Sequence, residues 1–356
     1  MSATQEQKAQ DRKAREKDEA RTPASTASAR RRRKAPAEPE RFALLGVWAV
    51  LIVAFSLIVP QTFPTAANVS NMLSSQVVLL ILAIGLLYPL RAGDYDLSVA
   101  STLNLATVVV AVLNVQQGWG IWPSVLVALV ASLLVGVLNG LIVTVFDINP
   151  FIVTLGMGTV VQGLIYLLSD SSTISGIDRV LSDAVLTQPF LGIPIGFFYA
   201  LALVVVAWYV FDHTAFGQRL LFVGQSHDVA RLNGVNVPRL RWRSLIISAG
   251  FAGLAGVVYA GTTASADPVS GASFLLPAFA ACFLGSTVLR IGRFNPWGTL
   301  IAVYFLVTGI TGLQLLGAQQ YVQQLFYGGA LVIAVVLSKL VRSRGERKRR
   351  AQAAAV

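Results

Sequence analysis

The chain has 356 residues, of which 55% are hydrophobic and 13% are charged, and its formal net charge is +11. Soluble domains carry about 25% charged residues, so this composition excludes an ordinary soluble globule and is typical of a polytopic membrane protein. A single cysteine, Cys282, excludes an internal disulfide, and the two histidines are too distant in sequence to indicate a zinc site. The sequence shows no nucleophile elbow or phosphate loop that would indicate an enzyme.

The first 41 residues are polar and rich in Lys, Arg, Glu, Ala and Ser. We expect residues 1–41 to form a disordered basic cytoplasmic arm that contacts anionic membrane lipid. A second basic segment, residues 341–356, is expected to form a cytoplasmic tail. Basic arms also bind nucleic acid in other proteins, but on a membrane protein we expect no nucleic-acid partner.

Residues 42–340 contain apolar runs long enough to cross a bilayer, which takes about 20 residues per helix. Strict apolar–polar alternation is absent, which argues against an outer-membrane barrel. We therefore predict an all-α polytopic membrane protein with about ten transmembrane helices, of which the eighth is short enough to be re-entrant. The predicted spans are 42–59, 72–91, 97–115, 124–146, 150–168, 197–211, 244–264, 274–289, 297–316 and 322–340.

The distribution of basic residues tests this threading, because lysine and arginine collect on the cytoplasmic side of membrane proteins. With ten spans and both termini cytoplasmic, Arg179 is the only one of the 28 basic residues that lies outside. The arginine-rich loop 212–243 falls inside, and the net acidic loop 169–196 falls outside. We expect the outer loop to meet an extracytoplasmic partner.

Two aspartates, Asp94 and Asp96, interrupt the apolar sequence in the stretch "YPLRAGDYDLSVASTLNL". One interpretation is a capped turn at the inner end of two spans, in which Asp94 pairs with Arg91. The other is a polar element of a translocation pathway, because a charge inside a bilayer persists only beside water or a partner. A polar stripe at helical spacing follows the turn and favours the pathway: Ser98, Ser101 and Asn104.

Other spans carry uncharged polar side chains that add to this candidate pathway, among them Asn139, Thr154 and Gln162. Uncharged hydrogen-bonding groups suit a neutral polyhydroxyl solute that is bound briefly and released. Taken singly, each of these residues also fits a hydrogen bond between packed helices. Only the set as a whole indicates a pathway.

The loop 212–243 contains a second informative stretch, which we predict to be a short helix over residues 226–234. Ser226 is a good N-cap, and Gly234 supplies a C-terminal stop. The apolar side of this helix, at Val229 and Leu232, is costly in water unless another protein covers it. The segment is therefore either an ordinary structured loop or a knob that docks on a cytoplasmic subunit.

Four stretches in one order resemble the permease subunit of carbohydrate-importing ABC transporters of the ribose/xylose/arabinose type. They are "GDYDLSVAS", "INPFIVTLGMGTVVQGLIYLLS", "VGQSHDVARLNGVNV" and "AFAACFLGSTVLRIGRFNPWGTLIAV", and the resemblance runs over residues 76–339. It departs from the family at Asp94, where the family usually has Gly, and in lacking an acidic residue before "AFAAC". The third stretch matches the family's coupling segment and implies contact with an ATPase through Gly224, Asp228, Ala230, Arg231 and Gly234.

The resemblance implies a permease subunit in the bacterial plasma membrane that translocates a sugar or sugar-like solute. It implies as partners ABC ATPase subunits, a second permease subunit that is identical or a paralogue, and an extracytoplasmic solute-binding protein. Because the sequence has no Walker A pattern, we expect no cofactor in this chain and ATP binding only by the partner ATPases. Three alternatives remain: a branched-chain amino-acid ABC permease, a secondary transporter, and a membrane scaffold that transports nothing.

Overall fold

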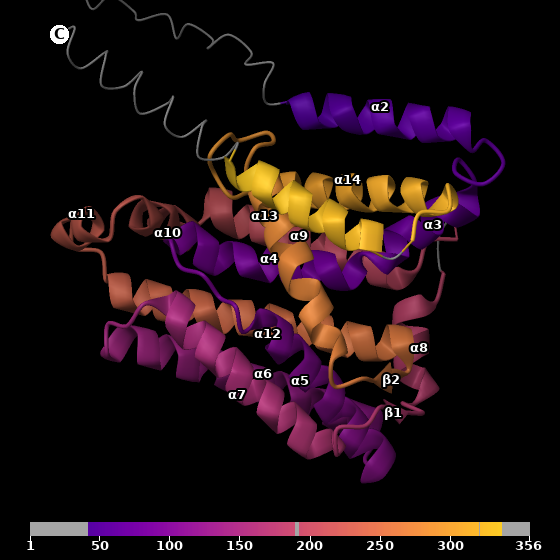
Figure 1. The fold of residues 1–356 in the computed structure, drawn as a ribbon. Helices are drawn as coiled ribbons and strands as arrows, with labels where there is room; N and C mark the ends of the chain where they lie inside the picture. The colour runs from indigo at the N-terminus through magenta and orange to yellow at the C-terminus, as the bar shows by residue number, and fades with distance from the viewer. Residues whose placement is uncertain (1–41, 189–191, 320, 337–356) are drawn as a thin grey trace, which may run out of the picture. The chain divides into compact units, whose positions relative to one another are not determined.

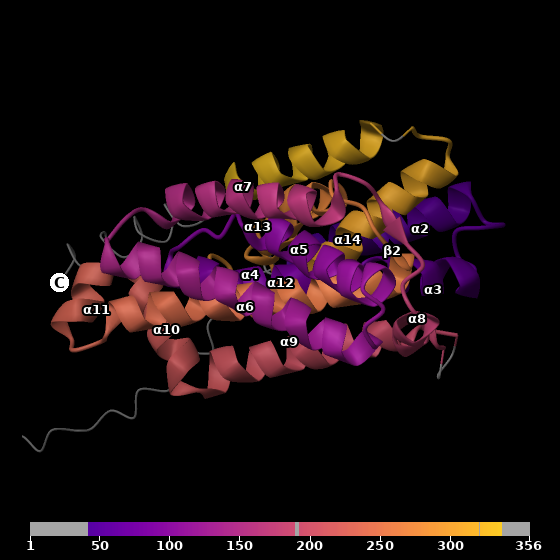
Figure 2. The ribbon, with the colours of Figure 1, turned by 90° about the horizontal axis from the view of Figure 1, so that it is seen from below.

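The computed structural model describes residues 42–188, 192–319 and 321–336. The expected arm over 1–41 and the expected tail over 341–356 lie outside the described residues. The described part consists of helices and one short two-stranded sheet (Figures 1 and 2). In chain order, the helices are α2 (Ala43–Ile58), α3 (Ala66–Ser75), α4 (Val77–Ala92), α5 (Val99–Ala111) with its π-helical continuation η2 (Val112–Gln116), α6 (Ile121–Val145), α7 (Pro150–Ser169), α8 (Arg179–Leu186), α9 (Ile195–His213), α10 (Ala215–Gln225), α11 (His227–Leu232), α12 (Val237–Thr263), the 3₁₀ turn η3 (Ser270–Phe274), α13 (Leu275–Gly285), α14 (Pro296–Leu315) and a last helix over Tyr321–Val336.

The apolar helices match the predicted spans closely. Six described helices are long and apolar enough to cross a membrane, or seven if the bent pair α3–α4 forms one span. Three shorter apolar helices, Ala43–Ile58, Ser270–Gly285 and Tyr321–Val336, correspond to the first, eighth and tenth predicted segments. The prediction of an all-α polytopic membrane protein is therefore confirmed, whereas the count of ten spans stays a prediction.

Helix α4 forms the centre of the helical assembly (Figure 1). Each of its 16 residues is buried, and it contacts α9, α10, α12, α13 and α14. Its sequence is apolar on all sides until the last turn, and such a helix is stable only when other helices surround it. The turn that follows α4 is consequently held deep among several elements.

Helix α12 packs against α5 and α6 with very little space between the backbones. A Cβ at Gly256 would lie 2.2 Å from the backbone oxygen of Leu103, and one at Gly136 would lie 2.6 Å from Cβ of Ala249. Small residues allow such close approach of helices in membrane proteins, where packing rather than burial from water drives association. This packing places α12 beside the start of α5, where the polar stripe begins.

The region over 169–196 has more structure than a loop. It contains β1 (Ile174–Ser175), which pairs antiparallel with β2 (Ser265–Ala266) at the end of α12, and the short helix α8. Asp178 caps α8 by accepting a hydrogen bond from the backbone N–H of Val180. Leu181 and Val185, four residues apart, are buried, so α8 packs one face on the bundle.

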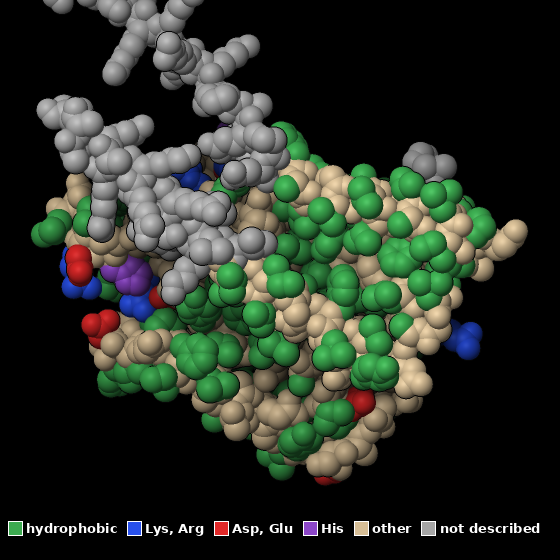
Figure 3. All heavy atoms as spheres, turned by 45° about the horizontal axis from the view of Figure 1, so that its top comes forward, with side chains coloured by type: hydrophobic (Ala, Val, Ile, Leu, Met, Phe, Trp, Pro, Cys, Tyr) green, Lys and Arg blue, Asp and Glu red, His purple; other side chains and the backbone are tan. Residues whose placement is uncertain are grey.

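Hydrophobic side chains are spread over the whole visible face in Figure 3, whereas the few charged side chains lie at its edges, most of them at the edge that carries α10 and α11. The exposed large apolar residues include many on α6, α7 and α9. A broad apolar surface of this kind is the surface expected of a protein that faces lipid.

Candidate functional site

The turn after α4 is a tight C-terminal helix stop. Gly93 has φ of +86°, the left-handed conformation that glycine adopts without steric cost. Its N–H donates to the oxygen of Leu90, and the N–H of Asp94 donates to the oxygen of Pro89 at 2.9 Å. This pair of bonds is the Schellman motif and satisfies two carbonyls at the end of α4. It points the chain toward α5 and buries both Asp94 and Asp96.

Asp96 starts a buried hydrogen-bond network that crosses from this turn to α6. Its Oδ1 accepts from the backbone N–H of Ser98 at 3.1 Å and from the Ser98 hydroxyl at 2.6 Å. The Ser98 oxygen in turn accepts from Asn139 Nδ2 at 2.8 Å. Asp96 Oδ2 and Asn139 Oδ1 are buried and have no hydrogen-bond partner among the described residues. Neither atom makes a hydrogen bond of normal geometry in this arrangement, although the Ser248 hydroxyl of α12 lies beside the Asp96 carboxylate.

Helix α7 joins the same turn through Thr154. The Thr154 hydroxyl accepts from the backbone N–H of Leu97 at 3.0 Å and donates to the oxygen of Pro150 at 2.8 Å. Four of the predicted pathway residues are thus brought together from the α4–α5 turn, α6 and α7. We call Asp96, Ser98, Asn139 and Thr154 the inner polar cluster.

Two other predicted pathway residues meet at a different place. Asn104 Nδ2 and Gln162 Nε2 both donate to the oxygen of Pro268, at 2.7 and 2.8 Å. Ser270 adds a hydrogen bond to Asn104 Oδ1 at 3.2 Å. Ser101 stands between Ser98 and Asn104 along α5, and its Oγ lies 3.5 Å from the position that a Cβ on Gly158 of α7 would take. The predicted pathway residues therefore form two separate clusters, and their hydrogen bonds link different helices and turns to one another.

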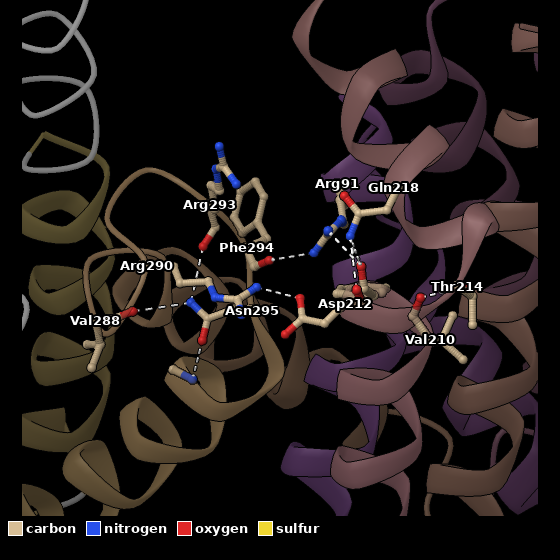
Figure 4. Close-up of polar contacts among 12 residues, drawn as sticks. Arg91, Val210, Asp212, Thr214, Gln218, Val288, Arg290, Arg293, Phe294 and Asn295 are labelled. Atoms are coloured by element: carbon tan, nitrogen blue, oxygen red, sulfur yellow. Dashed lines mark hydrogen bonds and ion pairs between the residues drawn. The ribbon is translucent and has the colours of Figure 1, made fainter. Parts of the chain in front are cut away.

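Asp94 pairs with Arg241 and not with Arg91. Arg241 Nε lies 2.8 Å from Asp94 Oδ2 and 3.2 Å from Oδ1, and the two side chains are only 10% and 2% exposed. The expected pair of Asp94 with Arg91 is thus wrong. The Arg91 guanidinium donates instead to the backbone oxygens of Phe211 and Phe294, and it lies over the Phe211 ring (Figure 4).

A second ion pair lies beside Arg91, between Arg290 and Asp212 (Figure 4). It connects the end of α9 to the segment before α14. Asn295, the N-cap of α14, accepts from the N–H of Gly298 and donates to the oxygens of Gly285 and Val288. These contacts hold the ends of α4, α9, α13 and α14 together at the end of the bundle where α10 and α11 begin.

The short helix predicted over 226–234 is confirmed as α11. Ser226 caps it by accepting from the N–H of Val229 at 3.3 Å, and Gly234 ends it with φ of +76°. Asp228 lies in the first turn and Arg231 in the last. Leu232 is 88% exposed and Val229 is 47% exposed, so the apolar side that we predicted is open.

The structure places Ala230 and Gly224 against other elements of this chain rather than on the open side of α11. Ala230 is fully buried and belongs to the same apolar cluster as Ala92 and Val223. Gly224 faces α4, because a Cβ there would lie 2.1 Å from the backbone oxygen of Arg91. Both residues therefore help to pack α10 and α11 onto this chain, and their part in the predicted contact with an ATPase stays a prediction.

Sequence reasoning missed two residues of this region, Arg241 and His227. Arg241 was counted only as one positive charge of a polar loop, but α12 begins at Val237 and carries it into the bundle. His227 Nε2 lies 3.0 Å from the oxygen of Ala92. The position of Arg241 within the first turns of a long apolar helix was the feature of the sequence that could have indicated its burial.

The comparisons with known proteins agree with this architecture. The family described as "Branched-chain amino acid transport system / permease component" matches residues 68–335. The ribose import permease protein of Bacillus subtilis is 30% identical over 293 residues, which are 82% of this chain and 90% of the relative. The galactose/methyl galactoside import permease protein of Salmonella typhimurium is 29% identical, over 84% of this chain and 95% of the relative.

The L-arabinose transport system permease protein of Escherichia coli is also 29% identical, over 84% of this chain and 90% of the relative. No solved structure matches the chain. The matched family region runs from α3 to the last described helix and includes the turn after α4 and the α10–α11 segment. The chain therefore belongs to this family of permease components and is a multi-pass membrane protein.

Proposed function

We propose that the chain is the permease subunit of an ATP-binding-cassette importer that carries a sugar or sugar-like solute across the bacterial plasma membrane. The similar relatives are named for ribose, galactose and arabinose import, which favours a sugar over the amino acid of the family description. The chemistry of the two polar clusters agrees, because amides and hydroxyls suit a neutral polyhydroxyl solute. A zwitterionic amino acid would need free charged groups in the pathway, whereas among the described residues the buried Asp94 carboxylate is already paired with Arg241.

The observation that carries this proposal is the build of α11. It is a six-residue helix, capped at both ends, fixed to the bundle by Ala230 and His227, with Leu232 almost fully exposed. An exposed leucine at the tip of a rigid, anchored helix suits docking into a groove on another protein. We propose that the groove belongs to a cytoplasmic ATPase subunit, which Asp228 and Arg231 also contact.

The remaining parts of the complex follow from this assignment. Ten membrane crossings with both termini cytoplasmic place α11 inside and α8 outside. A binding protein would deliver the solute to the outer region over 169–196, where Val180 and Leu186 of α8 are exposed. A second permease subunit, identical or a paralogue, would complete the pathway, and the apolar surface would contact lipid. ATP would be bound by the ATPase partners.

The inner polar cluster is our candidate for the inner gate of the pathway. Asp96, Ser98 and Asn139 bond to one another, Thr154 bonds the adjoining backbone of Leu97, and all four are buried, so the cluster joins the turn after α4, α6 and α7 at this end of the bundle. When the elements separate, the same groups, including the acceptors Asp96 Oδ2 and Asn139 Oδ1, become available to solute or water. Asn104, Gln162 and Ser101 would line the next part of the pathway toward the outside.

Solute uptake by cells tests the proposal. Bacteria that lack the chain would be compared with cells in which it is restored, using labelled ribose, arabinose, galactose and leucine. We expect restored uptake of at least one sugar, abolished by depletion of ATP but not by an uncoupler that leaves ATP intact. Restored uptake of leucine alone would assign the chain to amino acids, and uptake abolished by the uncoupler at constant ATP would indicate a secondary transporter.

A further inference from the structure

The segment that carries α11 contacts the turn after α4 at three separate points. We call residues 215–244, which comprise α10, α11 and the first two turns of α12, the coupling segment, and residues 91–96 the α4 turn. Gly224 lies against the backbone of Arg91, and His227 bonds the oxygen of Ala92. Arg241 forms the buried ion pair with Asp94. The α4 turn is thus contacted by a residue before α11, by the first residue of α11 and by a residue after it.

The third contact differs from the other two in strength and in chemistry. Both oxygens of Asp94 face the same Nε of Arg241, and the pair is almost completely shielded from water. The second acidic neighbour of Arg241, Asp147, is 3.8 Å away and 86% exposed. A buried charge that loses its only close partner is strongly unfavourable, whereas an exposed pair contributes little. Separation of Arg241 from Asp94 is therefore resisted far more than separation from Asp147.

The ion pair also stands next to the inner polar cluster. Asp94 is two residues before Asp96, whose carboxylate bonds Ser98 and through it Asn139 of α6. A displacement of Arg241 along with α11 would pull Asp94 and shift the start of this network. Two elements joined by a contact that resists separation can move together, so a displacement of one is transmitted to the other.

We propose that the Asp94–Arg241 pair is a lock that makes the coupling segment and the α4 turn move as one unit. This inference rests on the proposed function. When the ATPase displaces α11, the lock would transmit that displacement to the inner polar cluster. Asp94 and Arg241 are positioning residues, because they act through Asp96 and α11 and need not touch solute or ATP.

Loss of the lock predicts uncoupling. In Asp94→Asn, α11 stays folded on α4 through Ala230, Gly224 and His227, but the start of α12 is released. The ATPase would then hydrolyse ATP while fewer solute molecules cross per ATP. We expect the ratio of solute transported to ATP hydrolysed to fall by about tenfold, a typical size for coupling between sites.

A neutral double variant separates this role from a role in stability. Asp94→Asn combined with Arg241→Gln removes both charges, so no unpaired charge stays buried, and such replacements are often tolerated. We expect its thermal unfolding midpoint to be closer to that of the unaltered chain than the midpoint of Asp94→Asn is. Its transport-to-ATP ratio should nevertheless stay low. Asp147→Asn is the matched control, because it removes the exposed acidic neighbour of the same arginine and should leave the ratio unchanged.

A measurement on the permease alone tests the lock without any partner. A spin label on Arg239→Cys, an exposed position in the first turn of α12, in a Cys282→Ser background, reports the motion of this helix end in detergent-purified protein. We expect greater mobility in Asp94→Asn and in the double variant than in Asp147→Asn and in the parent. Equal mobility in all four proteins would overturn the lock. Raised mobility in a chain that transports nothing would leave the lock standing and refute the proposed function.

The assembled importer gives the final test. The permease variants would be reconstituted in liposomes with the ATPase and binding protein, and solute uptake and phosphate release measured together. A normal ratio in Asp94→Asn would show that transmission does not pass through the pair. Recovery of the ratio in the double variant would show that the pair serves stability only, and would equally refute the proposal.

Discussion

His227 Nε2 lies 3.0 Å from the backbone oxygen of Ala92, so the first residue of α11 bonds the last residue of α4. Ala92 is part of a helix in which every residue is buried. The contact therefore ties a helix that is exposed at Val229 and Leu232 directly to one that is buried along its whole length. Together with the Asp94–Arg241 pair, it explains how a six-residue helix keeps a defined orientation.

The two ends of the molecule should be accessible from opposite sides of the membrane. In a Cys282→Ser background, we expect Ser172→Cys, in the outer region, to react with an impermeant thiol reagent in intact cells. We expect Leu232→Cys, at the tip of α11, to react only after the cells are opened, when the chain is expressed without the partner ATPase that would cover this residue. Both outcomes follow from the placement of basic residues on the cytoplasmic side. Labelling of Leu232→Cys in intact cells would show that α11 faces the outside, the opposite of the predicted topology.

Asp96→Asn should impair transport without removing the protein from the membrane. Asn offers an acceptor for the Ser98 hydrogen bonds, but its amide replaces Oδ2 and removes the charge. Hydrogen bonds to a charged group contribute roughly 1.5–3 kcal/mol and neutral ones about half as much, so we expect a moderate loss of stability and a much larger loss of uptake. Uptake would be normalised to the amount of membrane-inserted protein.

The control for this variant is Asp170→Asn, at the exposed end of α7, which makes the same chemical change away from the polar clusters. Because Asn also tolerates the left-handed conformation that Asp170 adopts, this control should transport normally. If Asp96→Asn matches the control in uptake, Asp96 is not part of the gate and only stabilises the turn.

Two substitutions on α11 should have different effects because they point to different sides of the helix. Ala230→Glu places a charge at a fully buried position, and we expect it to lower the unfolding temperature and the yield of folded protein. Leu232→Ser changes an exposed side chain, and we expect normal folding with loss of solute-stimulated ATP hydrolysis in the assembled complex. Yield, thermal unfolding and ATPase stimulation would be measured for both. Full stimulation with Leu232→Ser would place the docking surface elsewhere.

Gly224→Ala should weaken the contact between α10 and α4. The new Cβ would lie 2.1 Å from the backbone oxygen of Arg91, and because backbone cannot move aside like a flexible side chain, α10 must shift. Overpacking of this kind costs about 1–3 kcal/mol, measurable as a lower unfolding midpoint. Gly156→Ala on α7 is the matched control, since nothing lies within 4 Å of its Cβ, and it should leave stability unchanged or slightly raised. Equal midpoints for the two variants would contradict the close contact.

The apolar spans and the caps of α11 were determined by the sequence itself. A bilayer requires long uninterrupted apolar runs, and the caps depend on residues only three to five positions apart, so both are readable from local sequence. The same reasoning named Asp96 and Ser98 separately as candidate pathway residues, and the structure joins them by a hydrogen bond. The sequence did not show that Asn139 bonds Ser98, because Asn139 was only one of many polar residues in other spans.

Tertiary structure alone decided the partner of Asp94 and the orientation of Ala230. Arg91 is three residues from Asp94 and was the obvious candidate by sequence, but the left-handed turn at Gly93 directs Asp94 away from it and toward Arg241, 147 positions later. Likewise, α11 has apolar residues on more than one side, and only its packing against α4 and α10 buries Ala230 while leaving Leu232 exposed. Contacts between segments so far apart depend on the path of the whole chain, which no local pattern of residues records.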